Sequence, residues 1–533
     1  MIDFDLRTFD KQKVQFIIAS SRKLIQPEVH TMPKLAAIDV GSNAMRLGIA
    51  SANDDGRLHI VHTDRQAVRL GADVFAKGEI SDKRLVEAMD AFLKFRKQIN
   101  QDKVKSIRAV GTSALREAKN RDYFISQIAK ATEITIEPIS DEEEARLVYL
   151  ATSRVVKLEG RVALLVDVGG GSVEISLANE REILATQSFA IGTVRLLQIL
   201  EQKKRGDRVF RQLAREYIKV GDTRLRKEIG EHKIDLCIAT GGNVESLGDL
   251  RVQLCDGKDN TSVTVDELES ILKELQSRSY EGRIKDFGLR PDRADVIIPA
   301  AIVLQSVARE THVEQILIPR VGVREGVLID MAANLKSTAG PLHRAQLITS
   351  AKLLGRKYDY DSQHALIVAR FAVGLFDATK KLHKLGYNER TLLEIAALLH
   401  DLGYYIDTTD HHKHSYYLIK SSPIIGLNDL EKTTVANVAR YHSRSFPKMS
   451  HGEYMNLSPK RRQVVVKLAA LLRLAEALDR EHASKVERFR VIEGKKRLTL
   501  RLKGQGDLLL ERWAVSHGSR LFERTYKRKI VIE

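Results

Sequence analysis

A short pattern that occurs twice constrains the fold of this chain more than any other feature. The segments Ala37–Asn43 (AIDVGSN) and Leu165–Ser172 (LVDVGGGS) each contain an apolar run that ends in aspartate, then a glycine turn and a serine. Their aspartates, Asp39 and Asp167, are 128 residues apart, which is a domain-sized separation. The repeat therefore predicts two similar α/β lobes that face each other across a cleft.

Strands and helices are predicted to alternate up to about residue 335, as they do in α/β proteins. The predicted strands are Leu35–Val40, Arg46–Ala50, Leu58–His62, Ser106–Val110, Thr135–Ile139, Val162–Asp167, Val173–Ala178, Asp235–Ala239 and Gln315–Ile318. The predicted helices include Asp82–Asn100, Asp141–Ser153, Val209–Ile229, Val265–Ser277 and Arg324–Asn334.

The remainder of the chain has a different pattern. Helices are predicted over Arg344–Leu385, Glu389–Leu402, His414–Ser421, Glu431–Tyr441 and Pro459–His482. Strands are predicted over Arg488–Ile492, Arg497–Leu502, Leu508–Val515 and Arg528–Ile532. We therefore expect an N-terminal extension (1–33), lobe I (34–157), lobe II (158–339), an all-α domain (340–484) and a small basic α+β domain (485–533).

Positive charge is concentrated in the last two of these segments. The chain has a net charge of +17, and residues 340–533 carry +15 of it, from 35 basic and 20 acidic residues. Such a field attracts polyanions, although a solvated basic surface is the alternative. The chain has two cysteines and no apolar run of about 20 residues, so we expect a cytoplasmic protein without a membrane span.

Each copy of the repeated pattern has the chemistry of a phosphate loop. Glycine allows consecutive backbone N–H groups to form a concave nest for phosphate oxygens, and the aspartate lies where a phosphate-bound divalent cation would sit. A third glycine turn, Ala239–Asn243 (ATGGN), also follows an apolar strand. The predicted phosphate-binding residues are Asp39, Gly41, Ser42, Asn43, Gly169, Gly170, Gly171, Ser172, Gly241 and Gly242.

Six segments occur in the order typical of one enzyme family. They are Ile38–Leu47 (IDVGSNAMRL), Val110–Asn120 (VGTSALREAKN), Glu142–Leu147 (EEEARL), Val166–Glu174 (VDVGGGSVE), Ala239–Gly248 (ATGGNVESLG) and Val321–Leu328 (VGVREGVL). Over about residues 34–335 the chain thus resembles the Ppx/GppA phosphatases, which include exopolyphosphatases and guanosine pentaphosphate phosphohydrolases. The resemblance implies the two-lobed fold shared by actin, sugar kinases and Hsp70.

The resemblance also implies roles for individual side chains. Glu144 matches the family's catalytic base, which activates water, and Arg116 matches an arginine thought to bind phosphate. Asp167 and Glu174 match carboxylates near a divalent metal, so Mg²⁺ or Mn²⁺ is the implied cofactor. The sequence departs from the family at Val173, where threonine is usual, so one hydroxyl is missing beside Glu174.

The residues themselves leave simpler alternatives open for the acidic positions. Ser140 and Glu143 have the spacing of a helix capping box, and an acidic first turn favours the helix dipole. That explanation gives Glu144 no role. Neighbouring acids would raise the pKa of Glu144, as a general base requires. Asp167 could be only a turn residue, and Glu174 could lie on an exposed strand face.

The helical segment resembles the HD phosphohydrolase superfamily, in which two histidines and two aspartates bind one metal ion. His364, the pair His400 and Asp401, and the distant Asp479 have the matching order, and such ligands suit a transition metal. A packing motif that has lost its metal is the alternative. His412, His414 and His442 could extend the site to a second ion, or could belong to a polar helix surface.

We expect an exopolyphosphatase that releases terminal orthophosphate, with the basic region holding the remaining polyphosphate. A guanosine pentaphosphate 5′-phosphohydrolase is the closest alternative, because it would use the same residues on a compact nucleotide. A kinase, a chaperone-type ATPase or a nucleotide-sensing protein without turnover also remains open. Nucleic acid is a less favoured partner, since the basic tail has few aromatic residues for stacking. A homodimer would join two basic surfaces.

Overall fold

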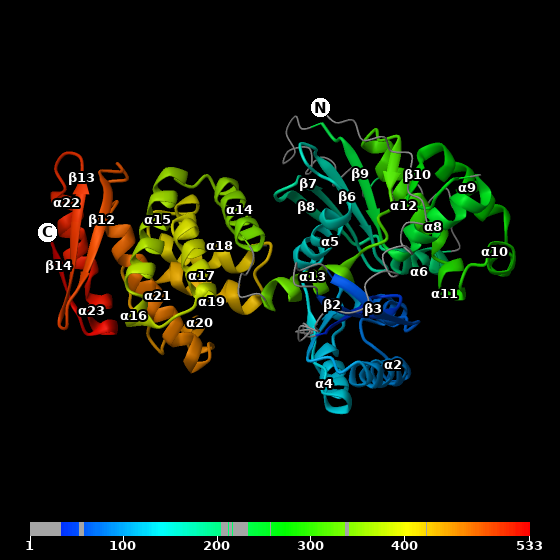
Figure 1. The fold of residues 1–533 in the computed structure, drawn as a ribbon, viewed down its shortest axis with the longest axis horizontal. Coiled ribbons are helices and arrows are strands. Elements are labelled where there is room, and N and C mark those ends of the chain that lie inside the picture. Colours follow the sequence, from blue (N-terminus) through cyan, green and yellow to red (C-terminus); the bar gives the residue numbers. More distant parts are fainter. Residues whose placement is uncertain are drawn as a thin grey trace, which may run out of the picture.

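The computed structural model of the chain describes residues 34–52, 58–203, 212, 216, 233–255, 257–335, 341–422 and 424–533. The expected extension (1–33) and nearly all of the predicted helix Val209–Ile229 lie outside these residues. The two lobes lie one above the other at one end of the long axis of the molecule, and the helical domain and then the small sheet, which carries the C-terminus, follow toward the other end (Figure 1). The α/β class and the division into two similar lobes are confirmed.

Lobe I is built on a five-stranded sheet in the order β3-β2-β1-β4-β5. The strands are β1 (Leu35–Val40), β2 (Met45–Ala52), β3 (Leu58–Gln66), β4 (Ser106–Gly111) and β5 (Ile136–Pro138). The helices are α1 (Leu70–Lys77), α2 (Asp82–Gln101), α3 (Ser113–Glu117) and α4 (Arg121–Thr132). All six residues of β1 are buried, because β2 and β4 flank it and helices cover the sheet.

Lobe II is built on a six-stranded sheet in the order β10-β11-β9-β6-β7-β8. The strands are β6 (Ala163–Val168), β7 (Val173–Ala178), β8 (Ile183–Phe189), β9 (Leu236–Thr240), β10 (Ser262–Thr264) and β11 (Gln315–Leu317). The helices are α6 (Thr193–Lys203), α8 (Gly242–Leu254), α9 (Val265–Ser277), α10 (Tyr280–Phe287), α11 (Pro291–Ala294) and α12 (Ile297–Glu310). Strands β8 and β10 are absent from the sequence-based assignment.

The two sheets repeat one topology, as the duplicated pattern predicts. In each lobe the aspartate-bearing strand pairs antiparallel with the next strand along the chain and parallel with a later one. The register is also the same, since Val40 pairs with Met45 and Val168 pairs with Val173. Each glycine turn is therefore the loop of an equivalent β-hairpin.

Two helices join the lobes. Helices α5 (Asp141–Val155) and α13 (Val323–Leu335) pack closely on each other, and an added Cβ on Gly326 of α13 would lie 2.0 Å from the carbonyl oxygen of Leu147. Although α13 follows lobe II in the sequence, its apolar face packs on β1 of lobe I. The first turn of α5 consequently has a fixed position at the junction of the lobes.

The C-terminal third forms one hydrophobic core from helices and a small sheet. The elements are α14 (Pro341–Lys357), α15 (Ser362–Ala378), α16 (Lys380–His383), α17 (Tyr387–Leu399), a 3₁₀ turn (Leu402–Tyr405), α18 (His411–Ser421), α19 (Asp429–Arg440), α20 (Gly452–Met455), α21 (Pro459–Ala477), β12 (Val486–Glu493), β13 (Arg497–Gly504), α22 (Leu509–Gly518), α23 (Arg520–Tyr526) and β14 (Lys529–Ile532). The expected all-α and basic domains share this core.

Two predicted elements are wrong in this region. The long helix predicted over Arg344–Leu385 is interrupted before α15, where Asp359 has a φ of +45° and Asp361 caps the new helix through the N–H of His364. The strand predicted over Leu508–Val515 is the helix α22. Its buried residues Glu511, Ala514 and Val515 have the i, i+3, i+4 spacing of a helix face rather than the alternation of a strand.

Candidate functional site

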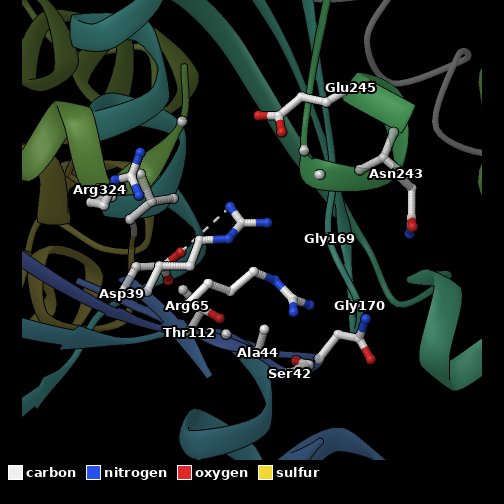
Figure 2. Close-up of a pocket in the computed structure, with 18 of the residues that line it drawn as sticks. Asp39, Ser42, Ala44, Arg65, Thr112, Gly169, Gly170, Asn243, Glu245 and Arg324 are labelled. Carbon is white, nitrogen blue, oxygen red and sulfur yellow. Dashed lines mark ion pairs between the residues drawn. The ribbon is translucent and has the colours of Figure 1, made fainter. Parts of the chain in front are cut away.

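The two repeated hairpin loops have the same internal hydrogen bond and face each other. The N–H of Gly41 donates to the carbonyl of Ala44, and the N–H of Gly169 donates to that of Ser172, both at 3.1 Å. The loops nearly touch, because a Cβ added to Gly170 would lie 3.0 Å from Cβ of Ser42. The predicted cleft therefore exists, and both loops line it (Figure 2).

The third glycine turn closes the cleft from lobe II. Gly241 has a φ of +109°, which favours glycine, and Gly242 begins α8. Both line a cavity of about 340 Å³ together with most of the predicted loop residues, namely Asp39, Gly41, Ser42, Asn43, Asp167, Gly169 and Gly170. Gly171 and Ser172 lie outside that lining, because Gly171 packs against Ser113 and Phe75.

Four carboxylates converge beneath the loops. Asp39 and Asp167 are the next-to-last residues of the repeated strands β1 and β6, Glu174 lies on β7 beside Asp167, and Glu144 lies in the first turn of α5. All four are buried, so Asp167 is not a solvated turn residue and Glu174 does not lie on an exposed strand face. Carboxylate oxygens of Glu144, Glu174 and the neighbouring Asp141 lie within 4.8 Å of one another.

Burial raises the pKa of all four carboxylates above its usual range. It raises the pKa of Glu174 to about 8, with the negative charge of Asp167 adding to the effect. Burial also raises the pKa of Asp39 to about 6, although Arg46 opposes the shift. The pKa of Glu144 is raised by burial and then by the negative charge of Glu174. A cation placed among these groups would lower all of these values.

The donor set fits a magnesium ion. One oxygen of Asp167 accepts a hydrogen bond from Thr240 at 2.6 Å, and one oxygen of Glu174 accepts from Ser188 at 3.0 Å. The second oxygen of Glu174 is buried and has no hydrogen-bond partner among the described residues. Carboxylates that are oriented by neighbouring hydroxyls and have a free oxygen are suitable Mg²⁺ ligands.

Arg116 does not line the cavity. Its guanidinium forms an ion pair with Asp141, donates to the carbonyl oxygen of Ile139 at 2.5 Å and lies 3.5 Å from Oε2 of Glu144. In this structure Arg116 holds the acidic first turn of α5. Ser140 caps that turn as predicted, but the Glu143 side chain binds Arg146 and Arg108 and does not complete a capping box.

Five arginines that sequence reasoning missed also line the cleft. They are Arg46, Arg65, Arg290, Arg293 and Arg324. Arg293 is buried, its Nε has no partner among the described residues, and burial and the positive charge of Arg46 lower its pKa to about 9. A desolvated cation beside other cations indicates an anion site. Arg46 and Arg324 belong to motifs quoted above, but Arg293 has no comparable sequence signal.

Polar contacts across the mouth of the cleft hold the lobes together. Arg65 and Arg69 of lobe I form ion pairs with Asp292 and Asp295 of lobe II. Asn43 donates from Nδ2 to the carbonyl oxygen of Asp292 and accepts from Nε of Arg69. The side chain of Asn43 thus connects the lobes. Only the backbone N–H of Asn43 is then available to the predicted phosphate nest.

The helical domain has a second cluster of ionisable groups. His364 on α15, His400 at the end of α17 and the adjacent Asp401 have ligand atoms within 4.8 Å of one another, as predicted. The structure does not bring Asp479 into that group. Its Oδ2 instead accepts a hydrogen bond from Nδ1 of His364 at 2.8 Å, and its Oδ1 accepts from the N–H of Ser484.

A second group in the same cluster differs from the prediction in one histidine. Asp401 also lies close to His411 and His442. His442 is one of the predicted second-site residues, but His412 and His414 are not in the group. The sequence offers three histidines at 411, 412 and 414 on one short helix, so spacing alone cannot tell which of them faces Asp401. The likeness to HD enzymes stays a prediction.

Comparison with known proteins gives the family. The Ppx/GppA phosphatase family matches residues 49–335, and domain III of Ppx/GppA phosphatases matches residues 348–512. The chain belongs to the Ppx/GppA phosphatase family. Its members hydrolyse phosphoanhydride bonds, so the chain is an enzyme of this class, as predicted from the six motifs.

Relatives with long matches share one name. A guanosine-5′-triphosphate,3′-diphosphate pyrophosphatase of Vibrio parahaemolyticus is 26% identical over 83% of this chain and 87% of its own. The Aeromonas hydrophila protein of the same name is 26% identical over 89% and 93%. A solved exopolyphosphatase from Cytophaga hutchinsonii has 27% identity and a TM-score of 0.53, over 56% of this chain and 98% of its own.

The described part of the chain contains no helix that is both long and apolar enough to cross a membrane.

Proposed function

We propose that this phosphatase removes the 5′-terminal phosphate of guanosine pentaphosphate. The relatives that support this substrate match both the lobes and the helical domain, whereas the exopolyphosphatase matches little more than half of the chain. The interlobe cavity also combines glycine loops, carboxylates and arginines in one place, which suits the compact phosphate group of a nucleotide. Polyphosphate, which the sequence favours as the substrate, becomes the second candidate.

The observation that carries the chemistry is the position of Glu144. Its carboxylate is buried next to Glu174, and burial raises its pKa, which makes it a stronger proton acceptor than an exposed glutamate. In the proposed step, Glu144 removes a proton from water, the water oxygen attacks the terminal phosphorus, and the anhydride P–O bond breaks. The products are orthophosphate and guanosine tetraphosphate, and the proton on Glu144 returns to solvent.

The other residues bind and orient the triphosphate in this proposal. Backbone N–H groups of the two hairpin loops and the cleft arginines would bind its oxygens. Mg²⁺ would be held by Asp167, which lines the cavity, and by Glu174, which lies outside that lining but pairs with Asp167 on the adjacent strand. The ion, when bound, neutralises charge on the transferred phosphate and supports in-line displacement. Arg116 positions Glu144 through the first turn of α5.

Polyphosphate remains a second candidate because of two observations. The net charge of +15 over residues 340–533 suits a long anion, and a solved exopolyphosphatase shares the fold. Orthophosphate release from both substrates, measured side by side with Mg²⁺, tests the choice. We expect the higher kcat/KM for guanosine pentaphosphate. A clear preference for long polyphosphate, with an affinity that falls steeply with salt, would overturn the proposed substrate.

A further inference from the structure

The small C-terminal sheet has two faces with different chemistry. The apolar side chains of β12, β13 and β14 belong to the core of the C-terminal third. Phe489 of β12, for example, packs edge-on against Phe371 of α15, with ring centroids 5.8 Å apart. Successive side chains of a strand point to opposite faces, so the alternate residues lie on the outer face of the sheet. Apart from Thr499 they are exposed, so the outer face is a surface of the folded chain.

Basic residues dominate this outer face. Six of its exposed side chains are arginine or lysine, namely Arg488, Arg490, Arg497, Arg501, Lys503 and Lys529. Among the described residues only Arg501 of the six forms an ion pair, with Glu533 at 2.7 Å. Lys495 and Lys496, in the turn between β12 and β13, are exposed next to this face. The outer face thus carries an excess of positive charge that nearby acidic residues do not balance.

Strand register places these charges directly opposite one another. Both members are basic in three cross-strand pairs: Arg488 with Lys503, Arg490 with Arg501, and Arg497 with Lys529. Like charges directly opposite each other on one face of a sheet are destabilising. An anion bound between paired side chains would remove this repulsion. Three such pairs on one face therefore indicate a ligand with several negative charges.

The spacing of the pairs favours a nucleic-acid strand over polyphosphate. Rows of side chains on one face repeat every two residues, which is about 6.8 Å along an antiparallel strand. Successive phosphates of an extended nucleic-acid strand have a similar separation, whereas the phosphorus atoms of polyphosphate lie much closer together. A row of Ile492, Thr499 and Val531 lies between the second and third basic pairs. Ile492 and Val531 are 42% and 36% exposed, and they offer an apolar contact to a base, which polyphosphate lacks.

The outer face is also remote from the interlobe cleft. The helical domain lies between the lobes and the small sheet along the long axis of the molecule (Figure 1). A nucleotide bound in the cleft cannot reach the sheet, and a polyphosphate chain with its end in the cleft would first have to cross the helical domain. The charge on the sheet therefore requires a ligand of its own.

We propose that the outer face of the C-terminal sheet binds single-stranded RNA. The three basic pairs would bind phosphates of one backbone, and Ile492 and Val531 would contact a base. A single strand leaves its bases free for this contact, and RNA is the nucleic acid that occurs mainly as single strands. Phosphates rather than stacked bases would supply most of the affinity, so the scarcity of aromatic residues does not oppose binding. Such binding should depend little on sequence and should weaken steeply with salt.

Fluorescence anisotropy of the full chain with labelled oligouridylate of about twelve nucleotides tests the surface. Removing two unpaired charges with Arg488→Gln and Arg490→Gln together should raise Kd at least about tenfold. Arg520→Gln with Arg524→Gln removes the same charge from exposed sites of α23 and should change Kd much less. The first double variant should melt at or above the parent temperature, because repulsion is relieved. No binding by the parent, or an equal loss in the two double variants, would overturn the proposal.

Competition separates RNA from other polyanions. At equal concentrations of phosphate groups, unlabelled oligouridylate should displace the labelled strand more effectively than duplex DNA or long polyphosphate. Ile492→Thr with Val531→Thr keeps β-branched residues and should weaken RNA binding at least about threefold, while polyphosphate binding stays unchanged. Stronger displacement by polyphosphate would assign the face to that anion. Slower phosphate release from guanosine pentaphosphate in the Arg488→Gln and Arg490→Gln double variant would assign the face to the hydrolytic site, and either result would overturn the proposal.

Discussion

The interlobe cleft and the helical cluster are both built from buried ionisable groups, but their donor atoms suit different ligands. The cleft combines carboxylates, backbone N–H groups and arginines, which suit a hard cation and a polyanion. The helical cluster combines imidazoles with one carboxylate, which suits transition metals. The two donor sets therefore favour different cations, and they lie in separate domains. The following predictions test that separation.

The largest effect is expected at the proposed base. Glu144→Gln should lower kcat for guanosine pentaphosphate by about 10²-fold or more, because the amide cannot accept the proton of water. Glu142→Gln changes a neighbouring acid on the same helix turn and should stay near the parent rate. Steady-state phosphate release measures both. Near-parental turnover by Glu144→Gln would remove this residue from the mechanism.

A large effect on cation requirement is expected at Asp167. Asp167→Asn should increase the Mg²⁺ concentration for half-maximal activity by at least about tenfold, since a metal-binding charge is lost. Asp122→Asn, at a fully exposed site in lobe I, is the control. Asp401→Ala should leave the Mg²⁺ titration unchanged. A parental Mg²⁺ titration for Asp167→Asn would contradict the assignment of the ion to the cleft.

Replacing the buried arginine of the cleft should weaken substrate binding without lowering the stability of the fold. Arg293→Met should raise KM at least about tenfold, because a charge-assisted hydrogen bond to phosphate is lost. The free energy of unfolding without substrate should be unchanged or higher, since a desolvated cation beside Arg46 is removed. Arg309→Met, an exposed arginine of α12, should change neither quantity. A large loss of stability in Arg293→Met would indicate a structural role.

The two regions should respond to pH in opposite directions. Glu174 has a raised pKa when folded, so the folded chain binds its proton more tightly than the unfolded chain, and stability falls as pH rises from about 4 to about 8. Burial lowers the pKa of His442, so its contribution is lost as pH falls below about 6.5. Without divalent ions, Glu174→Gln should melt above the parent by a margin that grows with pH. A constant margin would exclude this linkage.

The sequence predicted the fold of the lobes well because their pattern is local. A buried strand, an aspartate and a glycine turn are contiguous in the chain, so both loops and the positions of Asp39 and Asp167 could be read directly. The edge strand β10 has only three residues, which is too short for a periodic signal. The strand predicted over Leu508–Val515 is wrong because the residues of α22 that face the core have helical rather than alternating spacing.

The site residues that the sequence does not identify are brought into place by tertiary packing. Arg293 enters the cleft from a four-residue helix, and no local pattern marks its burial. Arg116 lies near Glu144, but its ion pair with Asp141 depends on how α3 meets α5. The choice of His411 over His412 and His414 likewise depends on how α18 faces the end of α17.

Hydrolysis of guanosine pentaphosphate in ¹⁸O-labelled water tests the central claim most directly. Attack of water on the terminal phosphorus in the interlobe cleft predicts one ¹⁸O atom in each released orthophosphate and none in guanosine tetraphosphate. The label should enter orthophosphate at the parent rate in Asp401→Ala and only very slowly in Glu144→Gln. Release of pyrophosphate, or label in the nucleotide product, would contradict the account, as would parental incorporation by Glu144→Gln.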